Sequence, residues 1–441
     1  MASMFGTDGI RGVVNVTMTP KFALRLGKAA GKVLGGKVAI ATDTRSSADM
    51  IKSAVSSGLV ASGCDVLDLG ILPVPALQHY VKVRADISGG IMVTASHNPP
   101  EFNGIKCISS DGTEASRGDE RKIEEAFSGQ LDDVDWLFAG DIDEVEDAED
   151  EYVDSVVSSV DAEAIRSAGL TVCADCANGA SYSVVPAVLG KLGVRTVAVN
   201  CYPSAGPSKN GPAELKALMA ASNADFGVTF DEDADRCFFT APDGRDISGD
   251  AALAIIARSV LSEGPGKVFT PVSTSSMVDD VVSAAGGLVV RTPVGAPAVA
   301  RMMMESDSVL GGEESGGLIF PRHQYCRDGA MAMAVMLECV SKRGSLSDQL
   351  DSLPEYHSVK AKVACPEDKR EVLYDRMKEK VSGLRTDLTD GLKIFFDDGW
   401  VLLRASGTEP SFRIFSESKD KEKAESRAEE YVSMAEEFLS S

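Results

Sequence analysis

The sequence predicts an α/β protein with three related α/β domains and a smaller α+β domain at the C-terminal end. Three stretches share one order of elements: an apolar strand, a polar loop, a helical pattern, a glycine turn and a second apolar strand. Strands that alternate with helices favour largely parallel sheets. The length of 441 residues allows about three domains at roughly 150 residues each. With 44% hydrophobic and 25% charged residues, the composition excludes a disordered or fibrous chain.

Each of the three repeats is expected to contain two strands joined by a helix. The strands fall at 37–45 and 64–70, at 170–175 and 194–199, and at 266–272 and 288–291. After Pro354 the pattern changes, with short strands near 358–364, 392–396, 400–404 and 412–416, and an amphipathic helix over 419–438. We therefore expect domains at 1–145, 146–247, 248–353 and 354–441.

The charge balance limits the partners of the protein. The chain has 67 acidic and 44 basic residues, a formal net charge of −23. Such a field repels nucleic acid and anionic membranes, so we expect neither as a partner. The first residues lack a basic region followed by an apolar one, and no apolar run reaches the roughly 18 residues that span a bilayer, so we expect neither a secretory leader nor a membrane span. Nine cysteines cannot all pair, and we expect a reduced, cytoplasmic protein.

One segment between Leu131 and Asp154 contains twelve acidic residues and no basic residue. An acidic interaction segment is one interpretation. The favoured interpretation is a solvated linker that leads into a helix near 150–165.

Three aspartates alternate in the loop after the apolar strand 226–229. In an extended loop, positions i, i+2 and i+4 face one side, so Asp231, Asp233 and Asp235 converge. Crowded carboxylates repel one another unless a cation joins them, and hard oxygen ligands suit Mg²⁺ or Ca²⁺. An EF-hand is excluded because its glycine position is Arg236 and its final glutamate position is Pro242. Apolar flanks disfavour a plain surface loop, so the loop predicts a metal site.

Ser96 lies in the polar loop Thr94-Ala-Ser-His-Asn-Pro-Pro-Glu-Phe-Asn-Gly-Ile-Lys106, after the apolar strand 90–93. α/β folds place their sites at the carboxyl ends of strands. Ser followed by His is compatible with a hydrolase nucleophile and base, but no Gly-x-Ser-x-Gly elbow is present, and adjacent side chains seldom face each other. The alternative is a turn of polar cap residues.

Two further loops suit a phosphorylated sugar. In Gly311-Gly-Glu-Glu-Ser-Gly-Gly317, glutamates beside serine suit sugar hydroxyls and glycines permit close approach, although a plain turn explains the pattern nearly as well. The loop Arg404-Ala-Ser-Gly-Thr-Glu-Pro410 supplies backbone N–H groups, two hydroxyls and a charged fork for a phosphate dianion. Its alternative is a turn with a solvated arginine.

Together the four loops predict a phosphoryl-transfer site, and in this order they resemble the α-D-phosphohexomutase family, which includes phosphoglucomutase/phosphomannomutase and phosphoglucosamine mutase. The opening loop Phe5-Gly-Thr-Asp-Gly-Ile-Arg-Gly12 extends the resemblance to the whole chain. The family implies a heart-shaped molecule with three similar α/β domains of mixed, mostly parallel sheets, a smaller fourth domain and a central cleft. By the same resemblance, Cys173 and Cys176 belong to a structural strand and loop rather than to a metal or redox site.

The resemblance also implies roles for individual residues. Ser96 would carry the phosphoryl group, and Asp231, Asp233 and Asp235 would bind one Mg²⁺ per subunit together with that phosphoserine. Positive charge at the reacting centre would come from Lys106, Arg11 and Arg236. The sugar hydroxyls would contact Glu313 and Ser315, and the phosphate that does not react would be held by Arg404, Ser406, Gly407, Thr408 and Arg413.

The implied reaction interconverts hexose 1-phosphate and hexose 6-phosphate through a bound hexose 1,6-bisphosphate, which also serves as activator. We expect Lys106 to accept the proton of the attacking hydroxyl, with its pKa lowered by Arg11 and the metal. The partners are small hexose phosphates, and the resemblance allows a homodimer. The alternatives are a metal-dependent sugar phosphatase and a non-catalytic sugar-phosphate-binding protein.

The chain departs from the family pattern at two positions. Gly317 stands where members often have His, and the nearby His323 is expected to be structural. Glu232 stands where many members have Gly or Pro, which adds negative charge to the metal loop. No residue clearly reads C2 of the sugar, so the sequence leaves mannose, glucose and glucosamine phosphates open.

Overall fold

A computed structural model describes residues 4–6, 8–203, 212–406 and 410–440. The chain divides into two compact units. The first unit comprises Met1–Ala252 and Ser315–Asp351, and the second comprises Leu253–Glu314 and Ser352–Ser441. None of the helices in these described ranges is both long and apolar enough to cross a membrane.

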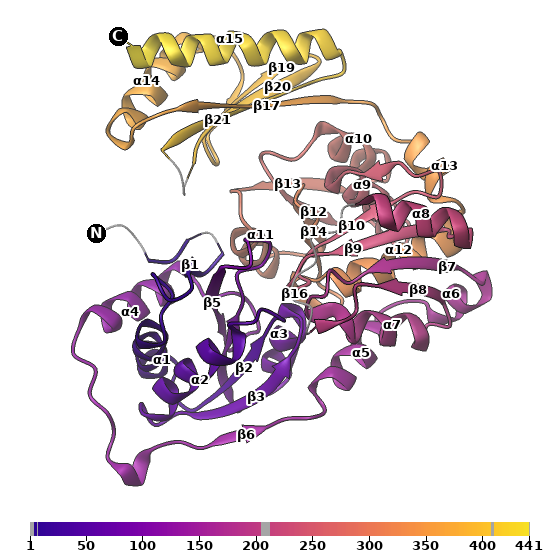
Figure 1. Cartoon of the computed structure of the whole chain (residues 1–441). Coiled ribbons are helices and arrows are strands. Elements are labelled where there is room, and N and C mark those ends of the chain that lie inside the picture. The colour runs from indigo at the N-terminus through magenta and orange to yellow at the C-terminus, as the bar shows by residue number, and fades with distance from the viewer. Residues whose placement is uncertain (1–3, 7, 204–211, 407–409, 441) are drawn as a thin grey trace. The chain divides into compact units, whose positions relative to one another are not determined.

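The N-terminal sheet of the first unit has six strands in the order β1-β5-β4-β2-β3-β6. Figure 1 labels β1, β2, β3, β5 and β6 of this sheet. The pairs β4–β2, β2–β3 and β3–β6 are parallel, and β1–β5 and β5–β4 are antiparallel. The strands are β1 (Ile10–Val13), β2 (Lys37–Thr42), β3 (Asp65–Ile71), β4 (Ile87–Val93), β5 (Phe102–Ser109) and β6 (Ile142–Glu144). The helices are α1 (Pro20–Leu34), α2 (Ala48–Val60), α3 (Val74–Lys82) and α4 (Arg117–Ser128). The predicted parallel pair at 37–45 and 64–70 is confirmed as β2 and β3.

A second sheet in the same unit has the order β11-β10-β9-β7-β8. Its strands are β7 (Thr171–Asp175), β8 (Arg195–Val199), β9 (Phe226–Phe230), β10 (Cys237–Thr240) and β11 (Asp246–Ile247). Strands β7 and β8 are parallel, as predicted, whereas β9 and β10 form an antiparallel pair that opposes Phe230 to Cys237. The aspartate loop is therefore the turn of this hairpin.

The helix expected near 150–165 is two helices, so that expectation is wrong. Helix α5 (Ala148–Ser158) ends before α6 (Ala162–Ala168) begins. Asp161 accepts a hydrogen bond from the backbone N–H of Ala164, which is the arrangement of an N-cap and starts a new helix. The helices α7 (Val184–Lys191) and α8 (Pro212–Ser222) complete this part of the unit.

The acidic segment is largely exposed, as the linker interpretation predicts, but it has structure of its own. Its short helical turn η1 (Trp136–Phe138) leaves the Trp136 side chain 81% exposed. Farther along, β6 adds an edge strand to the N-terminal sheet, a role the composition did not indicate.

The first unit also contains a hairpin from the later part of the chain, β15 (Leu318–Phe320) and β16 (Gln324–Arg327), which pair antiparallel. Helices α12 (Gly329–Arg343) and α13 (Leu346–Asp351) follow. Helix α12 is buried on all sides from Gly329 to Val340, and Asp328 caps its start by accepting from the N–H of Met331.

In the second unit, β12 (Lys267–Pro271) pairs parallel with both β13 (Leu288–Thr292) and β14 (Ser308–Gly312). The parallel pair predicted at 266–272 and 288–291 is thereby confirmed. The accompanying helices are α9 (Gly249–Leu261), α10 (Ser276–Ala284) and α11 (Ala296–Met304).

The C-terminal part of the second unit is the predicted α+β domain. Its antiparallel sheet has the order β17-β21-β20-β19-β18. The strands are β17 (His357–Ala364), β18 (Thr386–Asp387), β19 (Leu392–Phe396), β20 (Gly399–Ala405) and β21 (Ser411–Ser418), and the helices are α14 (Arg370–Lys380) and α15 (Lys421–Ser440). A core that includes Leu373, Ile394, Leu403 and Tyr431 joins the helices to the sheet.

Candidate active site

The serine loop and the aspartate loop meet within the first unit. Ser96 follows the end of β4, and Asp231 follows the end of β9. The Ser96 hydroxyl donates a hydrogen bond to Oδ2 of Asp231 at 3.1 Å, and Nη2 of Arg236 donates to the Ser96 Oγ at 2.7 Å. Two loops 135 residues apart in sequence thus place a serine beside three carboxylates and an arginine.

Ser96 is fully buried and has a φ of 49°, in the left-handed region that residues with a Cβ seldom adopt. Its own N–H donates to Oγ1 of Thr94 at 2.9 Å. Backbone strain of this kind is stable only where the surroundings fix it. The conformation of the serine loop is therefore fixed by its surroundings, unlike that of an ordinary surface turn of polar residues.

Arg45, which the sequence analysis did not single out, fixes the serine loop. Its guanidinium donates to the carbonyl oxygens of Ser96, Asn98 (2.7 Å), Pro99 (2.8 Å) and Phe102 (3.0 Å). Its Nε lies 3.1 Å from Oδ2 of Asp43, and both side chains are fully buried. In the sequence, the one indication of this role is the Asp-x-Arg pattern directly after β2.

His97 contradicts the expectation that adjacent Ser and His side chains do not face each other. Its Nδ1 lies 3.2 Å from the Ser96 Oγ and 2.6 Å from Nη2 of Arg236. Burial, followed by the positive charges of Arg236 and Arg11, lowers the pKa of His97. A neutral ring can accept the hydrogen bond from Arg236.

The three aspartates converge as the alternation predicted. Oxygen atoms of Asp231, Asp233 and Asp235 lie within 4.8 Å of one another, and all three residues are buried. Burial, and repulsion by the other two carboxylates, raises the pKa of Asp231 despite the neighbouring Arg236. Among the described residues, Oδ1 of Asp233 has no hydrogen-bond partner. A buried carboxylate oxygen without a partner, in a set of hard oxygen donors, fits a divalent cation such as Mg²⁺.

Lys106 lies at the centre of this charge cluster and is 2% exposed. Its Nζ is 2.8 Å from Asp233 Oδ2, 3.1 Å from Asp235 Oδ2 and 3.1 Å from Asp8 Oδ1. Burial alone would lower the pKa of Lys106, but these three carboxylates raise it above its ordinary value. The expectation of a lowered pKa is therefore wrong for this arrangement, because carboxylates, rather than Arg11, surround the ammonium.

The remaining cations predicted for the reacting centre also lie here. Arg236 Nε is 2.8 Å from Asp231 Oδ2 and 3.3 Å from Asp235 Oδ1. Arg11 is ion-paired with Asp8, and its Nη1 donates to Oδ1 of Asn98, in the serine loop, at 2.7 Å. The structure thus brings Arg11, Lys106 and Arg236 to the serine and aspartate loops.

A second acidic group was missed by the sequence analysis. Asp8 and Glu114 lie with Asp235 within the same 4.8 Å limit. Nη2 of Arg327 is 2.9 Å from Asp8, 3.1 Å from Glu114 and 2.7 Å from Asp235. Arg327 and Lys106 therefore pair with these carboxylates and offset their negative charge.

The predicted sugar and phosphate residues belong to both units. Ser315 is half-buried in the first unit, whereas Glu313 is buried in the second, where its Oε1 accepts from the N–H of Gly295 at 3.0 Å. His323, expected to be structural, is buried in the first unit and stacks on His79. Gly407 and Thr408 lie outside the described residues.

Within the second unit, Arg404 and Arg413 are directly opposite on β20 and β21, and Lys362 of β17 is opposite Arg413. Residues directly opposite in adjacent strands place their side chains on the same face, so the three cations form a row across the sheet. Arg404 Nε also lies 2.8 Å from Asp390 Oδ2. Ser406, two residues after Arg404 in the chain, is buried.

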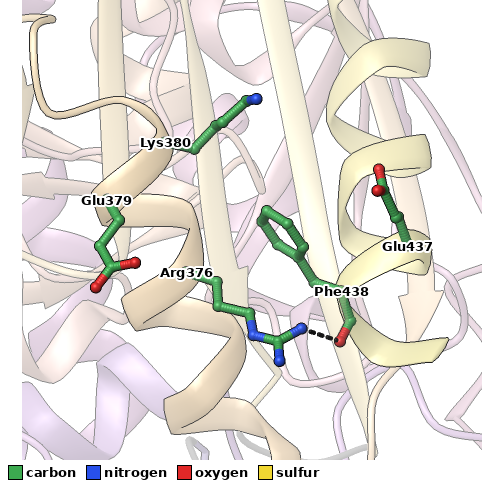
Figure 2. Close-up of a pocket in the computed structure, with 5 residues that line it drawn as sticks. All are labelled: Arg376, Glu379, Lys380, Glu437 and Phe438. Atoms are coloured by element: carbon green, nitrogen blue, oxygen red, sulfur yellow. Dashed lines mark hydrogen bonds between the residues drawn. The ribbon is translucent and has the colours of Figure 1, made fainter. Parts of the chain in front are cut away.

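A shallow pocket between α14 and α15 is a separate feature of the second unit. Arg376, Glu379, Lys380, Glu437 and Phe438 line it, and Arg376 Nη1 donates to the carbonyl oxygen of Phe438 at 3.1 Å (Figure 2). Two acids and two bases offset one another here, so the pocket has no net charge that would select an anion.

Known proteins are similar to the chain along its whole length. Four family models match in succession: phosphoglucomutase/phosphomannomutase alpha/beta/alpha domains I (residues 2–132), II (150–244) and III (248–356), and the C-terminal domain (361–434). A phosphoglucomutase/phosphomannomutase of Thermococcus kodakarensis is 41% identical, with 100% of both chains covered. A probable phosphoglucosamine mutase of Methanopyrus kandleri is 40% identical, covering 98% of this chain and 97% of the relative.

A solved structure has the same fold. The crystal structure of a phosphoglucomutase/phosphomannomutase family protein from Burkholderia thailandensis superposes with a TM-score of 0.86 at 25% identity. The superposition covers 99% of this chain and 97% of the other.

Proposed function

We propose that this chain, which belongs to the phosphoglucomutase/phosphomannomutase family and is a hexose-phosphate mutase, works through a phosphoserine at Ser96. The observation that carries the proposal is the position of the Ser96 hydroxyl, within hydrogen-bond distance of Asp231 and Arg236. A phosphoryl group on this oxygen would be bordered by cationic side chains and by a cluster of hard oxygen donors.

The reaction consists of two phosphoryl transfers. In the first, the free O1 or O6 hydroxyl of a hexose monophosphate attacks phosphorus, and the bond between phosphorus and the Ser96 oxygen breaks. The sugar hydroxyl gives up its proton and the Ser96 oxygen gains one, so no net proton is released. The product is a hexose 1,6-bisphosphate and an unmodified serine. In the second, the serine takes the other phosphoryl group, which leaves the isomeric monophosphate. A covalent relay of this kind divides the isomerisation into two in-line displacements.

The residues around Ser96 stabilise the charge that moves. Arg236 and Lys106 place positive charge at the serine and aspartate loops, and Arg11 adds a third cation through its contact with Asn98. The buried carboxylate group fits a divalent cation, and we assign one Mg²⁺ per chain to Ser96, Asp231, Asp233 and Asp235. When bound, the ion supplies Lewis-acid stabilisation to the transferring oxygens. In this proposal the protonated Lys106 supplies positive charge at the reaction centre. It does not accept the proton of the attacking hydroxyl, the role that the sequence suggested.

Recognition of the substrate belongs to other loops. We assign the sugar hydroxyls to Glu313 and Ser315. The phosphate that does not react is assigned to Arg404, Ser406, Gly407, Thr408 and Arg413, with the row of cations on β17, β21 and β20 as the supporting observation. Free hexose 1,6-bisphosphate would act as activator, since it restores the phosphoserine of a chain that has released its intermediate.

We divide the chain at 1–145, 146–247, 248–353 and 354–441, so that each domain contributes one of the four loops. The excess of acidic residues disfavours nucleic acid as a partner, whereas the cations around Ser96 support small hexose phosphates. We propose a cytoplasmic enzyme, for which a homodimer is possible as an assembly. A relative named phosphoglucomutase/phosphomannomutase and one named probable phosphoglucosamine mutase are similar to the chain to almost the same degree. The specificity for the sugar must therefore be measured.

The test incubates the protein with Mg²⁺, a trace of hexose 1,6-bisphosphate, and the 1-phosphates of glucose, mannose and glucosamine in turn. We expect the 6-phosphate of at least one sugar, and the fastest sugar identifies the substrate. Release of inorganic phosphate would instead support a sugar phosphatase, and binding without turnover a sugar-phosphate-binding protein. Mass spectrometry should locate phosphate on Ser96. Ser96→Ala should abolish both signals, whereas Ser53→Ala, at an exposed serine of α2, should retain them.

A further inference from the structure

Arg327 occupies the space where a side chain at position 317 would begin. A Cβ added to Gly317 would lie 2.3 Å from Cδ and 2.8 Å from Cγ of Arg327. These atoms are in the middle of the arginine side chain, so a small rotation of its end does not relieve the contact. The backbone at Gly317 is outside the left-handed region, and therefore its dihedral angles do not require glycine. Space for Arg327 is the reason that the structure gives for glycine at this position.

The guanidinium that passes Gly317 ends in the charge cluster of the candidate site. Arg327 is the last residue of β16 and is 8% exposed. Its Nη2 is within 3.1 Å of three carboxylates from three separate segments: Asp8 of the opening loop, Glu114 after β5, and Asp235 of the aspartate loop. One side chain thus joins the aspartate loop to two segments of the N-terminal domain.

Two of these carboxylates are shared with Lys106. Asp8 and Asp235 each lie 3.1 Å from the Lys106 Nζ, which also contacts Asp233. Without the arginine, Lys106 would be shared by three carboxylates, with Arg11 still paired to Asp8 and Arg236 to Asp235, and Glu114 would lose its contact with Arg327. Carboxylates in a buried group repel one another strongly when a cation is removed. The positions of Asp8 and Asp235 beside Lys106 therefore depend on Arg327.

We propose that Gly317 and Arg327 act as one unit, in which the missing side chain at 317 lets Arg327 hold Asp8 and Asp235 in position around Lys106. Arg327 is a positioning residue for the reaction centre, acting through groups that face the phosphoryl group. The inference rests on the proposed function for the roles of Lys106 and Asp235, whereas the contact between positions 317 and 327 does not depend on it.

The test is a double-mutant cycle with Gly317→Ala, Arg327→Ala and the combined variant. Gly317→Ala should lower the melting temperature and kcat of the wild-type background, because its Cβ displaces the arginine. In the Arg327→Ala background the same substitution should change little, since the nearest remaining arginine atom, Cβ, is an ordinary 3.4 Å away. Arg327→Met keeps the length of the stem without the charge, so Gly317→Ala should still lower the melting temperature in that background.

The kinetic readout separates positioning from a general loss of structure. We expect Arg327→Ala to reduce kcat by on the order of 10–100-fold, as small displacements at a reaction centre do, with KM changing much less. The Mg²⁺ affinity, measured by calorimetry, should fall as well. Arg327→Lys should restore part of kcat, because it returns the charge without the planar fork. Gly190→Ala is the matched control, because the described residues place no atom within 4 Å of the added methyl group apart from its chain neighbours and the backbone of its own helix.

Additive effects in the cycle, or an Arg327→Ala protein with wild-type kcat and Mg²⁺ affinity, would overturn the inference. If Arg327→Ala does not fold by circular dichroism, Gly317→Ala alone decides: wild-type kcat and Mg²⁺ affinity in that variant contradict the inference. A wild-type protein without mutase activity would overturn the proposed function instead. The melting-temperature cycle still tests the contact between 317 and 327 in that case.

Discussion

The main chain of Glu232 lies directly against the Cα of Gly179. A Cβ at 179 would be 2.6 Å from the carbonyl oxygen of Glu232 and 2.7 Å from its Cα. The N–H of Ala180 donates to the same carbonyl oxygen at 2.8 Å. The loop after β7 therefore supports the aspartate loop through backbone contacts, and the contribution of Glu232 to this support comes from its main chain.

Gly179→Ala should accordingly disturb the aspartate loop. The atoms that a methyl group would meet belong to the backbone, so they cannot rotate away, and overpacking of this kind costs about 1–3 kcal/mol. We expect a lower melting temperature and a weaker Mg²⁺ affinity by calorimetry. Gly190→Ala, in open space on α7, is the control. Wild-type Mg²⁺ affinity in Gly179→Ala would show that the loop does not depend on this contact.

Removal of Mg²⁺ should lower the stability of the first unit. A ligand that binds only the folded state stabilises it by about 2.7 kcal/mol at a concentration of 100 times Kd. We expect the melting temperature to rise with Mg²⁺ and to return to the apo value when EDTA is added. Asp233→Asn should lose this rise, because it removes the carboxylate whose Oδ1 has no partner among the described residues. Asp49→Asn, at an exposed carboxylate of α2, should keep it. An undiminished rise in Asp233→Asn would contradict the metal site.

Local patterns explain why the strands and the aspartate loop could be predicted. Asp231, Asp233 and Asp235 are near one another in the sequence, so the alternation along an extended chain was enough to show that they converge. The parallel pair of β2 and β3 followed in the same way from apolar runs on either side of one helix.

The residues that the sequence analysis missed are joined by tertiary contacts. Asp8, Glu114 and Arg327 are ordinary charged residues in their own segments, and only the fold brings them together. The sequence shows glycine at position 317, but it does not show why. The reason, that the side chain of Arg327 fills the space beside it, follows only from the structure. The pKa of Lys106 was predicted in the wrong direction for the same cause, since its contacts with Asp233, Asp235 and Asp8 arise from the fold.

Arg45→Met should destabilise the first unit and the serine loop together. The substitution leaves Asp43 buried without its ion pair and leaves the carbonyl oxygens of Ser96, Asn98, Pro99 and Phe102 without their shared donor. Breaking a buried pair by removing one partner costs about 3–5 kcal/mol. Calorimetry should show the loss in the melting temperature.

Because burial raises the pKa of Asp43 to about 6 even with Arg45 present, a second substitution of Asp43 to Asn should recover part of the stability in Arg45→Met. The phosphate content of Ser96, measured by mass spectrometry, should stay low in the double variant, since the carbonyl oxygens still lack their donor. A single variant as stable as the wild type would contradict the role of Arg45 as an anchor.

Acid should weaken the first unit through a pair of stacked histidines. The rings of His79 and His323 lie 5.2 Å apart. The groups facing His79 are His323, Asp328, Lys82, Arg84 and the ring of Tyr152. Burial, followed by His323, lowers the pKa of His79 to about 4, even though Asp328 opposes this shift. The folded state therefore holds His79 neutral.

In the unfolded chain the same imidazole has a pKa of about 6.5. Between pH 6.5 and pH 4 the unfolded state thus binds a proton that the folded state excludes, and stability decreases as the pH falls through this window. The full contribution is present above about pH 6.5, and its loss amounts to about 3 kcal/mol at the acid end.

His79→Gln removes the titrating group, so the melting temperature of the variant should decline less steeply than that of the wild type between pH 7 and pH 4.5. The relevant quantity is the difference between the two curves, because carboxylates elsewhere titrate equally in both proteins. His357→Gln in the second unit leaves the stack intact and should follow the wild-type curve. Parallel curves for His79→Gln and the wild type would show that His79 has the same pKa in the folded and unfolded states, and that the burial of this pair does not set the acid stability of the unit.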